Sequence, residues 1–126
     1  MSLRRLRRDV RGATAVEFAL TAPVLFVILL ALCECGMLVW SQLGLQHGAE
    51  MAARCATFNS TTCGDSTAIQ SFAVQNSFGL NVPASTFTVT APACGNQVSA
   101  TYSFQFIATY FGLSSVTLTA QSCFPK

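Results

Sequence analysis

Charged side chains are scarce in this 126-residue sequence: they make up 10% of the residues, against 52% that are hydrophobic. From Ser66 to Pro125 there is no Asp, Glu, Lys, Arg or His at all. General acid–base catalysis needs such groups, so the C-terminal part of the chain excludes it. An uncharged surface rich in Thr, Ser and Gln, with no charges at its sheet edges, suits packing against other subunits; the alternative is an ordinary secreted-protein surface.

Residues that could bind a metal or act with a catalytic nucleophile are also few. His47 is the single histidine, which is too few for a histidine-based metal cluster or a Ser-His-Asp triad, and we expect it to be an exposed helix residue. Cys33 and Cys35 lie two apart, and such residues point to different sides of a helix. The sequence therefore predicts a protein that is not an enzyme, with no catalytic residue, metal, cofactor or small-molecule substrate.

The bulk properties favour a protein linked to a membrane. A chain of 126 residues forms one small domain and has no room for a large catalytic core. Its mean hydropathy of +0.49 is high for a freely soluble protein of this size.

The positive charge is concentrated in a leader, residues 1–12. Five arginines against one aspartate give the leader a net charge of +4, and the rest of the chain carries −2. Basic residues beside an apolar segment stay on the cytoplasmic side, so we expect the N-terminus inside and the C-terminus outside. The rest of the chain has no basic patch that could neutralise phosphates, so we expect no binding of nucleic acid. The leader arginines are Arg4, Arg5, Arg7, Arg8 and Arg11.

The apolar run from Phe18 to Trp40 is long enough to cross a bilayer. It contains one charged residue, Glu34, and as a helix it would measure about 34 Å. Pro23 bends its first turns, which membrane helices tolerate. We predict a transmembrane helix over residues 13–40 and an extracytoplasmic domain over residues 41–126.

Export signals offer other interpretations of the same segment. A secretory signal peptide would use Ala31 and Cys33 as the small residues before its cut, yet the apolar run continues to Trp40. A lipoprotein signal ending at Cys33 requires a small residue where Leu32 stands. The twin arginines Arg7-Arg8 lack the context of a twin-arginine signal.

The stretch from Gly12 to Phe18 (GATAVEF) resembles the processing site of type IV pilin-like proteins. The resemblance implies that a membrane peptidase cuts between Gly12 and Ala13 on the cytoplasmic side, so that Glu17 becomes the fifth residue of the mature chain. It also implies that Glu17 pairs with the new amino terminus of a neighbouring subunit. An ionised carboxylate in hydrocarbon is costly without such a partner. The alternative for Glu17 is an interfacial acid that meets Arg11 or lipid head groups.

A longer stretch, Arg11 to Leu20 (RGATAVEFAL) followed by Pro23, is similar to the N-terminal signature of TadE-like pseudopilins or minor pilins of the Tad (Flp-type tight adherence) pilus system. The Glu17-Phe18 pair also matches Flp-type prepilins. The resemblance is specific from Arg11 to Gly36. It implies a component of pilus assembly, used in adhesion or secretion, with its helix in the bacterial inner membrane and its C-terminal domain in the periplasm.

The partners implied by this resemblance are a prepilin peptidase, other pilins or pseudopilins, and the inner-membrane assembly platform. An alternative function is an exported stand-alone binding domain with a signal peptide or a permanent membrane anchor. A small thiol enzyme is a third and weaker hypothesis.

The long helix is expected to run from Ala13 to about Ala56, so that it continues past the membrane segment. Gly44 and Gly48 weaken this second part. A loop over 59–66 precedes a second helix, Thr67–Phe78, which Asp65 or Ser66 caps and Gly79 ends. Its inward residues should be Ile69, Phe72, Ala73 and Phe78.

Residues 86–91, 98–106 and 116–121 alternate apolar and polar side chains, which predicts three strands. Turns at Pro92–Asn96 and Gly112–Ser115 connect them into an antiparallel meander with one face on the helices. The fold class is therefore α+β: a long N-terminal transmembrane helix that continues into a small domain with a short helix and a three-stranded antiparallel sheet.

Four cysteines, Cys55, Cys63, Cys94 and Cys123, fall outside the membrane, where disulfides stabilise small domains. Three pairings are possible. The meander brings the turn at Cys94 to the same edge as the end of the last strand, so we expect Cys94–Cys123, and Cys55–Cys63 across a short loop. Each disulfide contributes on the order of 2–4 kcal/mol.

Overall fold

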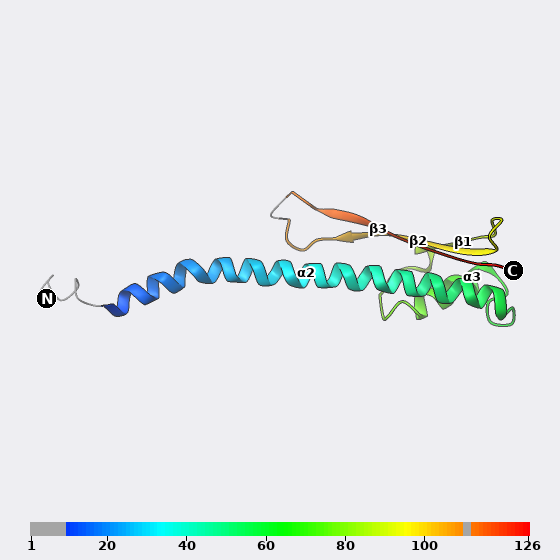
Figure 1. The fold of residues 1–126 in the computed structure, drawn as a ribbon, viewed down its shortest axis with the longest axis horizontal. Coiled ribbons are helices and arrows are strands. Elements are labelled where there is room, and N and C mark those ends of the chain that lie inside the picture. The colour runs from blue at the N-terminus through cyan, green and yellow to red at the C-terminus, as the bar shows by residue number, and fades with distance from the viewer. Residues whose placement is uncertain (1–9, 110–111) are drawn as a thin grey trace, which may run out of the picture. The chain divides into compact units, whose positions relative to one another are not determined.

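The computed structural model describes residues 10–109 and 112–126 (Figure 1). Most of the basic leader expected at the N-terminus, residues 1–9, lies outside the described residues. The chain divides into two compact units, residues 1–35 and 36–126. The fold is α+β, as the sequence predicts.

Helix α2 (Val10–Phe58) runs from the first unit into the second and extends two residues beyond the expected end at Ala56. Within residues 10–109 and 112–126, it is the one helix long and apolar enough to cross a membrane, by length and composition. Its most apolar window is not buried at all within the chain. In the second unit the helix changes character, since Leu45, Ala49 and Ala52 are fully buried there.

Helix α3 (Ser66–Gln75) starts as expected, because the Asp65 carboxylate accepts a hydrogen bond of 2.7 Å from the Ala68 amide. Its C-terminal end differs from the expectation of Phe78. The helix stops at Gln75 with Asn76 as its C-cap, and Phe78 is 51% exposed instead of facing inward. Phe78 adopts a left-handed conformation (φ 52°), which ends helices and is uncommon for a bulky side chain.

Ser77 takes the buried position at the end of α3. Its side chain is fully buried, and its hydroxyl donates to the Ala73 carbonyl at 2.6 Å. This bond satisfies a polar group that would otherwise be costly to bury. The chain then turns away through Phe78 and Gly79, so the aromatic ring stays at the surface.

Gly44 and Gly48, expected only to weaken α2, are where the end of α3 approaches it. A Cβ at Gly44 would lie 2.7 Å from the Ser77 carbonyl oxygen. A Cβ at Gly48 would overlap the Ser77 hydroxyl and lie 2.7 Å from the Ala73 carbonyl oxygen. The missing side chains allow close backbone packing, which offsets the low helix propensity of glycine.

The sheet follows a short 3₁₀ helix, η1 (Ala84–Thr86), and consists of β1 (Phe87–Thr90), β2 (Asn96–Gln105) and β3 (Ser115–Phe124). The strand order is β1-β2-β3 and both pairs are antiparallel, which confirms the predicted meander. Asn96, expected in a turn, begins β2, and its side-chain amide donates to the Ala56 carbonyl at 3.1 Å. The buried face of the sheet carries Phe87, Val98, Ala100, Phe104, Leu118 and Ala120.

Glutamines from the helices cover parts of the two outer strands. Gln42 and Gln46 of α2 donate to the carbonyls of Thr119 (2.8 Å) and Gln121 (3.3 Å) on β3. Gln70 of α3 donates to the Phe87 carbonyl on β1 at 2.7 Å. The edges of the sheet carry no charged side chains, as the sequence suggests. Glutamine side-chain amides bond several of the backbone carbonyl oxygens of the edge strands.

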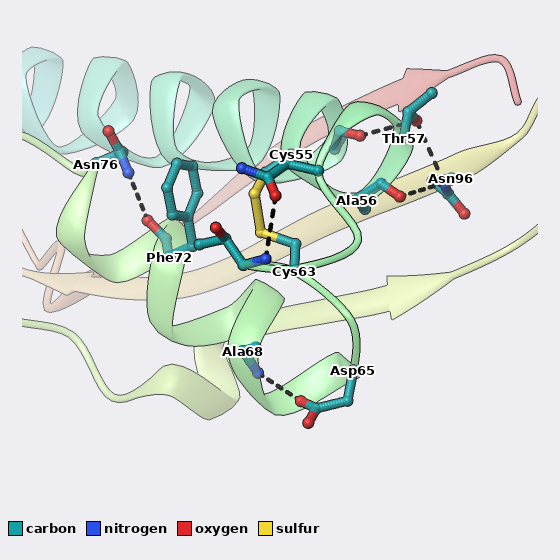
Figure 2. The surroundings of a disulfide bond; sticks show 12 residues. Cys55, Ala56, Thr57, Cys63, Asp65, Ala68, Phe72, Asn76 and Asn96 are labelled. Carbon is teal, nitrogen blue, oxygen red and sulfur yellow. Dashed lines mark hydrogen bonds between the residues drawn. A yellow bond between two sulfur atoms is a disulfide. The ribbon is translucent and has the colours of Figure 1, made fainter.

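The four cysteines of the second unit form Cys55–Cys63 and Cys94–Cys123, the same two pairs expected from the meander. Figure 2 shows the first disulfide joining the end of α2 to the loop before α3, beside Phe72. Cys55 and Cys63 are buried and belong to the core. The second disulfide connects the β1–β2 turn to the end of β3.

Replacing Gly48 with Ala should destabilise the second unit. Overpacking against Ser77 and the Ala73 carbonyl should outweigh the gain in helix propensity, so we expect the free energy of unfolding to fall by about 2 kcal/mol. Denaturation of the full chain in detergent, followed by Trp40 fluorescence, measures the change. Gly36→Ala is the matched control, because a Cβ there meets nothing within 4 Å. Equal effects of the two variants would contradict the close contact at Gly48.

Removing either disulfide by a double Cys→Ala substitution should lower the free energy of unfolding by about 2–4 kcal/mol. The same denaturation measurement, with and without reductant, tests this. Cys33→Ser/Cys35→Ser is the control, since both thiols are free and lie in the first unit. If reductant left the wild-type transition unchanged, the two disulfides would not be contributing to stability.

Candidate functional site at the N-terminal end of the apolar helix

Glu17 lies on α2 in the first unit, and its side chain is exposed. Among the side chains that the structure describes, none forms a salt bridge with it. Apolar residues surround it along the chain: the neighbouring side chains of Val16, Phe18 and Leu20 are 61–72% exposed. The site is therefore a single carboxylate on a helix surface that is mostly apolar.

The backbone just after Glu17 is locally weakened. The Thr21 hydroxyl donates to the carbonyls of Glu17 (3.0 Å) and Phe18 (3.3 Å), a side-chain contact that often bends helices. Pro23 lies inside the helix and has no N–H to donate to the preceding turn. Figure 1 shows α2 changing direction near its blue end. Glu17 thus lies on a short helical segment with a weak point between it and the rest of the apolar stretch.

Gly12 and Ala13, the residues of the expected cleavage site, are helical and exposed. A Cβ at Gly12 would meet nothing within 4 Å, so packing within the chain does not require glycine at this position. Glycine in a helix costs about 0.5–1 kcal/mol relative to alanine. Because the bond between Gly12 and Ala13 lies within helical residues, a peptidase would have to unwind this turn to reach it.

The apolar residues after Glu17 supply the other half of the site. Large side chains from Val24 to Leu32 are 46–64% exposed on the isolated chain. Burying one such side chain fully is worth about 1.5–3 kcal/mol, so lipid or other helices around the stretch would stabilise it. This arrangement can place Glu17 in a low-dielectric environment, where an opposite charge would bind it strongly.

His47, expected to be exposed, is half-buried: its Nδ1 lies 2.7 Å from the Asn76 carbonyl oxygen and its ring stacks on Phe78 with centroids 4.4 Å apart. The expectation was wrong because α3 ends against this face of α2, beside Gly44 and Gly48, and a tertiary contact of this kind leaves no local pattern in the sequence.

A hollow beside the first disulfide holds the other charged side chain of interest, Arg54. An open hollow of about 350 Å³ beside the Cys55–Cys63 disulfide is mostly apolar, and Arg54 is its single charged residue. The Arg54 guanidinium lies over the Phe124 ring, 5.6 Å from its centroid. In the parts of the chain that the structure covers, no three His, Cys, Asp or Glu side chains gather as a metal site would require.

Comparison with known proteins identifies the region that contains this site. Residues 12–54 match the family model TadE, described as TadE-like protein. No curated protein and no solved structure matches the chain. The matched region begins at Gly12, includes Glu17 and the whole apolar stretch, and ends at Arg54 within the second unit. The resemblance predicted from the sequence is confirmed: the chain carries a TadE-like region over residues 12–54.

Proposed function

We propose that this chain is a membrane-anchored pseudopilin or minor pilin that takes part in assembly of a Tad/Flp-type pilus used in adhesion or secretion. The observation that carries the proposal is the TadE-like match, which begins at Gly12 and runs through Glu17 and the apolar helix. The role is structural: the chain supplies a helix and a small domain for contact with other proteins, and no catalysis.

In this proposal the basic leader stays in the cytoplasm, α2 crosses the inner membrane, and residues 41–126 lie in the periplasm. The charge distribution supports this orientation, because arginines concentrate before the apolar stretch. The two disulfides of the second unit support an oxidising compartment for that part of the chain.

Glu17 sets the register between neighbouring helices. Cleavage after Gly12 by a prepilin peptidase creates a positively charged amino group at Ala13, four residues and about 6 Å along the helix from Glu17. The helix N-terminus adds partial positive charge of its own. Pairing this amino group with Glu17 of the next subunit offsets neighbouring helices by about one turn, and burial of both charges makes any other offset costly.

Gly12 fits this role because its Cα carries no side chain and packing within the chain gives no reason for a glycine. Recognition by the peptidase supplies such a reason. The other partners are pilins or pseudopilins that contact the apolar helix, and the assembly platform in the inner membrane.

The competing function is an exported stand-alone binding domain with either a permanent membrane anchor or a signal peptide cut near Glu34. Two observations disfavour the signal peptide. Helix α2 is unbroken through that position, and the TadE-like match continues to Arg54. A cut there would remove about half of the matched region, so the match favours retention of the whole helix.

Mass spectrometry of the protein extracted from membranes should find an N-terminus at Ala13. The chain should be produced in a host that contains the prepilin peptidase. Gly12→Leu is the control, because a side chain at that position should block the cut and leave the leader attached. An N-terminus near Glu34 would support secretion and contradict the proposal. An uncut chain would contradict the peptidase step, and deletion of the gene, scored for pilus formation, would then decide the function.

Glu17→Gln should abolish or strongly reduce pilus formation and co-purification with other pilins. The substitution keeps the shape of the side chain but removes the charge that pairs with a neighbouring amino terminus. Counting pili by electron microscopy and measuring co-purification test both effects. Glu17→Asp, which keeps the charge, should retain part of the activity, and Glu50→Gln, an exposed residue of the second unit, should have no effect. Normal pili with Glu17→Gln would overturn the role of this carboxylate.

A further inference from the structure

The open hollow of about 350 Å³ beside the first disulfide has no role in the proposed function. Met51, Arg54 and Phe58 of α2 and Phe72 of α3 line what we call the Arg54 hollow, which lies entirely within the second unit. Its lining is mostly apolar, and the Phe58 side chain is 77% exposed. Small-molecule pockets are usually enclosed, so an open hollow of this size suits a side chain that protrudes from another protein.

Helix α2 presents three of these lining residues on one face, because Met51, Arg54 and Phe58 are three and four residues apart. The thioether of Met51 adapts its shape and makes favourable contacts with aromatic rings. Phe72 is half-buried on α3 beside the disulfide (Figure 2). Phenylalanine rings pair well with a further ring placed edge-on or offset. The lining therefore favours an aromatic occupant.

The loop after α2 forms another wall of the hollow, and the protein itself holds that wall in place. The Cys55–Cys63 disulfide ties the loop to α2. The Asn59 side-chain oxygen accepts a hydrogen bond of 3.1 Å from the Thr62 amide, and the Asn59 carbonyl accepts one of 2.9 Å from the Cys63 amide. A preformed wall lowers the entropic cost of binding a partner.

Arg54 is the single charged residue of the lining. Its guanidinium lies over the Phe124 ring of β3, 5.6 Å from the centroid, and this contact restrains the side chain. The N–H donors of a guanidinium lie in its plane, away from a ring that covers its face. Within the described part of the chain, no group accepts a hydrogen bond from Arg54. Its donors are therefore available to an acceptor on another protein.

The acidic side chains of the second unit do not neutralise Arg54. Glu50 stands four residues earlier on α2, a spacing that favours an ion pair, yet among the described residues no salt bridge joins the two. Asp65 is used as the N-cap of α3. A carboxylate on a partner would supply the counter-charge that this hollow lacks.

We propose that the Arg54 hollow binds a partner protein through an aromatic side chain that lies next to a carboxylate in the partner's sequence. The ring contacts Met51, Phe58 and Phe72, and the carboxylate accepts hydrogen bonds from the Arg54 guanidinium, whose fork of donors matches its two oxygens. The inference goes beyond the proposed function and does not rest on it, because every residue involved belongs to the second unit.

Methyl NMR of the full chain in lipid nanodiscs, labelled with ¹³C at the methionine methyl groups, tests the proposal. Met51 reports on the hollow, and Met37, which does not line it, is the internal control. Met51→Leu assigns the signal. The main probe is the capped dipeptide N-acetyl-aspartyl-phenylalanine amide. The asparaginyl version removes only its charge, and N-acetyl-aspartyl-alanine amide removes only its ring.

We expect N-acetyl-aspartyl-phenylalanine amide to shift the Met51 signal saturably and to leave the Met37 signal in place. Its dissociation constant should be about 3- to 5-fold lower than that of the asparaginyl peptide, as for a charge pair open to water. The alanine peptide should give no saturable shift. Arg54→Gln should make the two phenylalanine peptides bind equally, while Arg54→Lys, which keeps the charge, should retain part of the preference. Arg54 is exposed, so neither substitution should disturb the fold.

Equal affinity of the wild-type chain for the aspartyl and asparaginyl peptides would overturn this inference, and so would a Met51 signal that no peptide shifts. Persistence of the full preference in Arg54→Gln would show that another group recognises the carboxylate, which also overturns it. A Met51 signal that shifts with protein concentration in the absence of peptide would show that a second copy covers the hollow, against the partner proposed.

Discussion

The structure depends on one constraint, which is that a single unbroken helix must satisfy two different environments. The first part of α2 exposes mostly apolar side chains, while its last turns place small residues against α3 and the sheet. Gly44 and Gly48 allow α3 to approach at backbone distance, and Ala49, Ala52 and Ala53 are fully buried beside them. Small residues bury little apolar area, so such a thin core gains more than most from two disulfides.

Among the described residues of the second unit, several polar side chains take part in holding the fold together. Ser77 closes α3, Asn96 fixes the start of β2, and glutamines cover strand carbonyls. In the described part of the chain, no buried side-chain polar atom lacks a hydrogen-bond partner. The chemistry of the proposed function is the pairing of Glu17 with a neighbouring chain.

Much of the fold could be predicted because its signals are local. Alternating residues predicted the three strands, Asp65 predicted the start of α3, and the meander suggested the disulfide pairs. Phe78 and His47 could not be placed, because their positions follow from the approach of α3 to α2, which depends on glycines that sequence rules score as helix weakeners. For the candidate site, the TadE-like match confirms the family resemblance of its surroundings. The cleavage at Gly12 and the pairing of Glu17 stay predictions, since both need a second molecule.

The glutamine bonds between α2 and β3 have a mechanical consequence. Gln42 and Gln46 connect the helix to a strand that runs in the same direction, with bonds that lie across the long axis of both. A pull along α2, such as the proposed pilus would exert, loads these bonds together in shear and does not peel them one at a time. The small domain would therefore follow its helix under tension as one body.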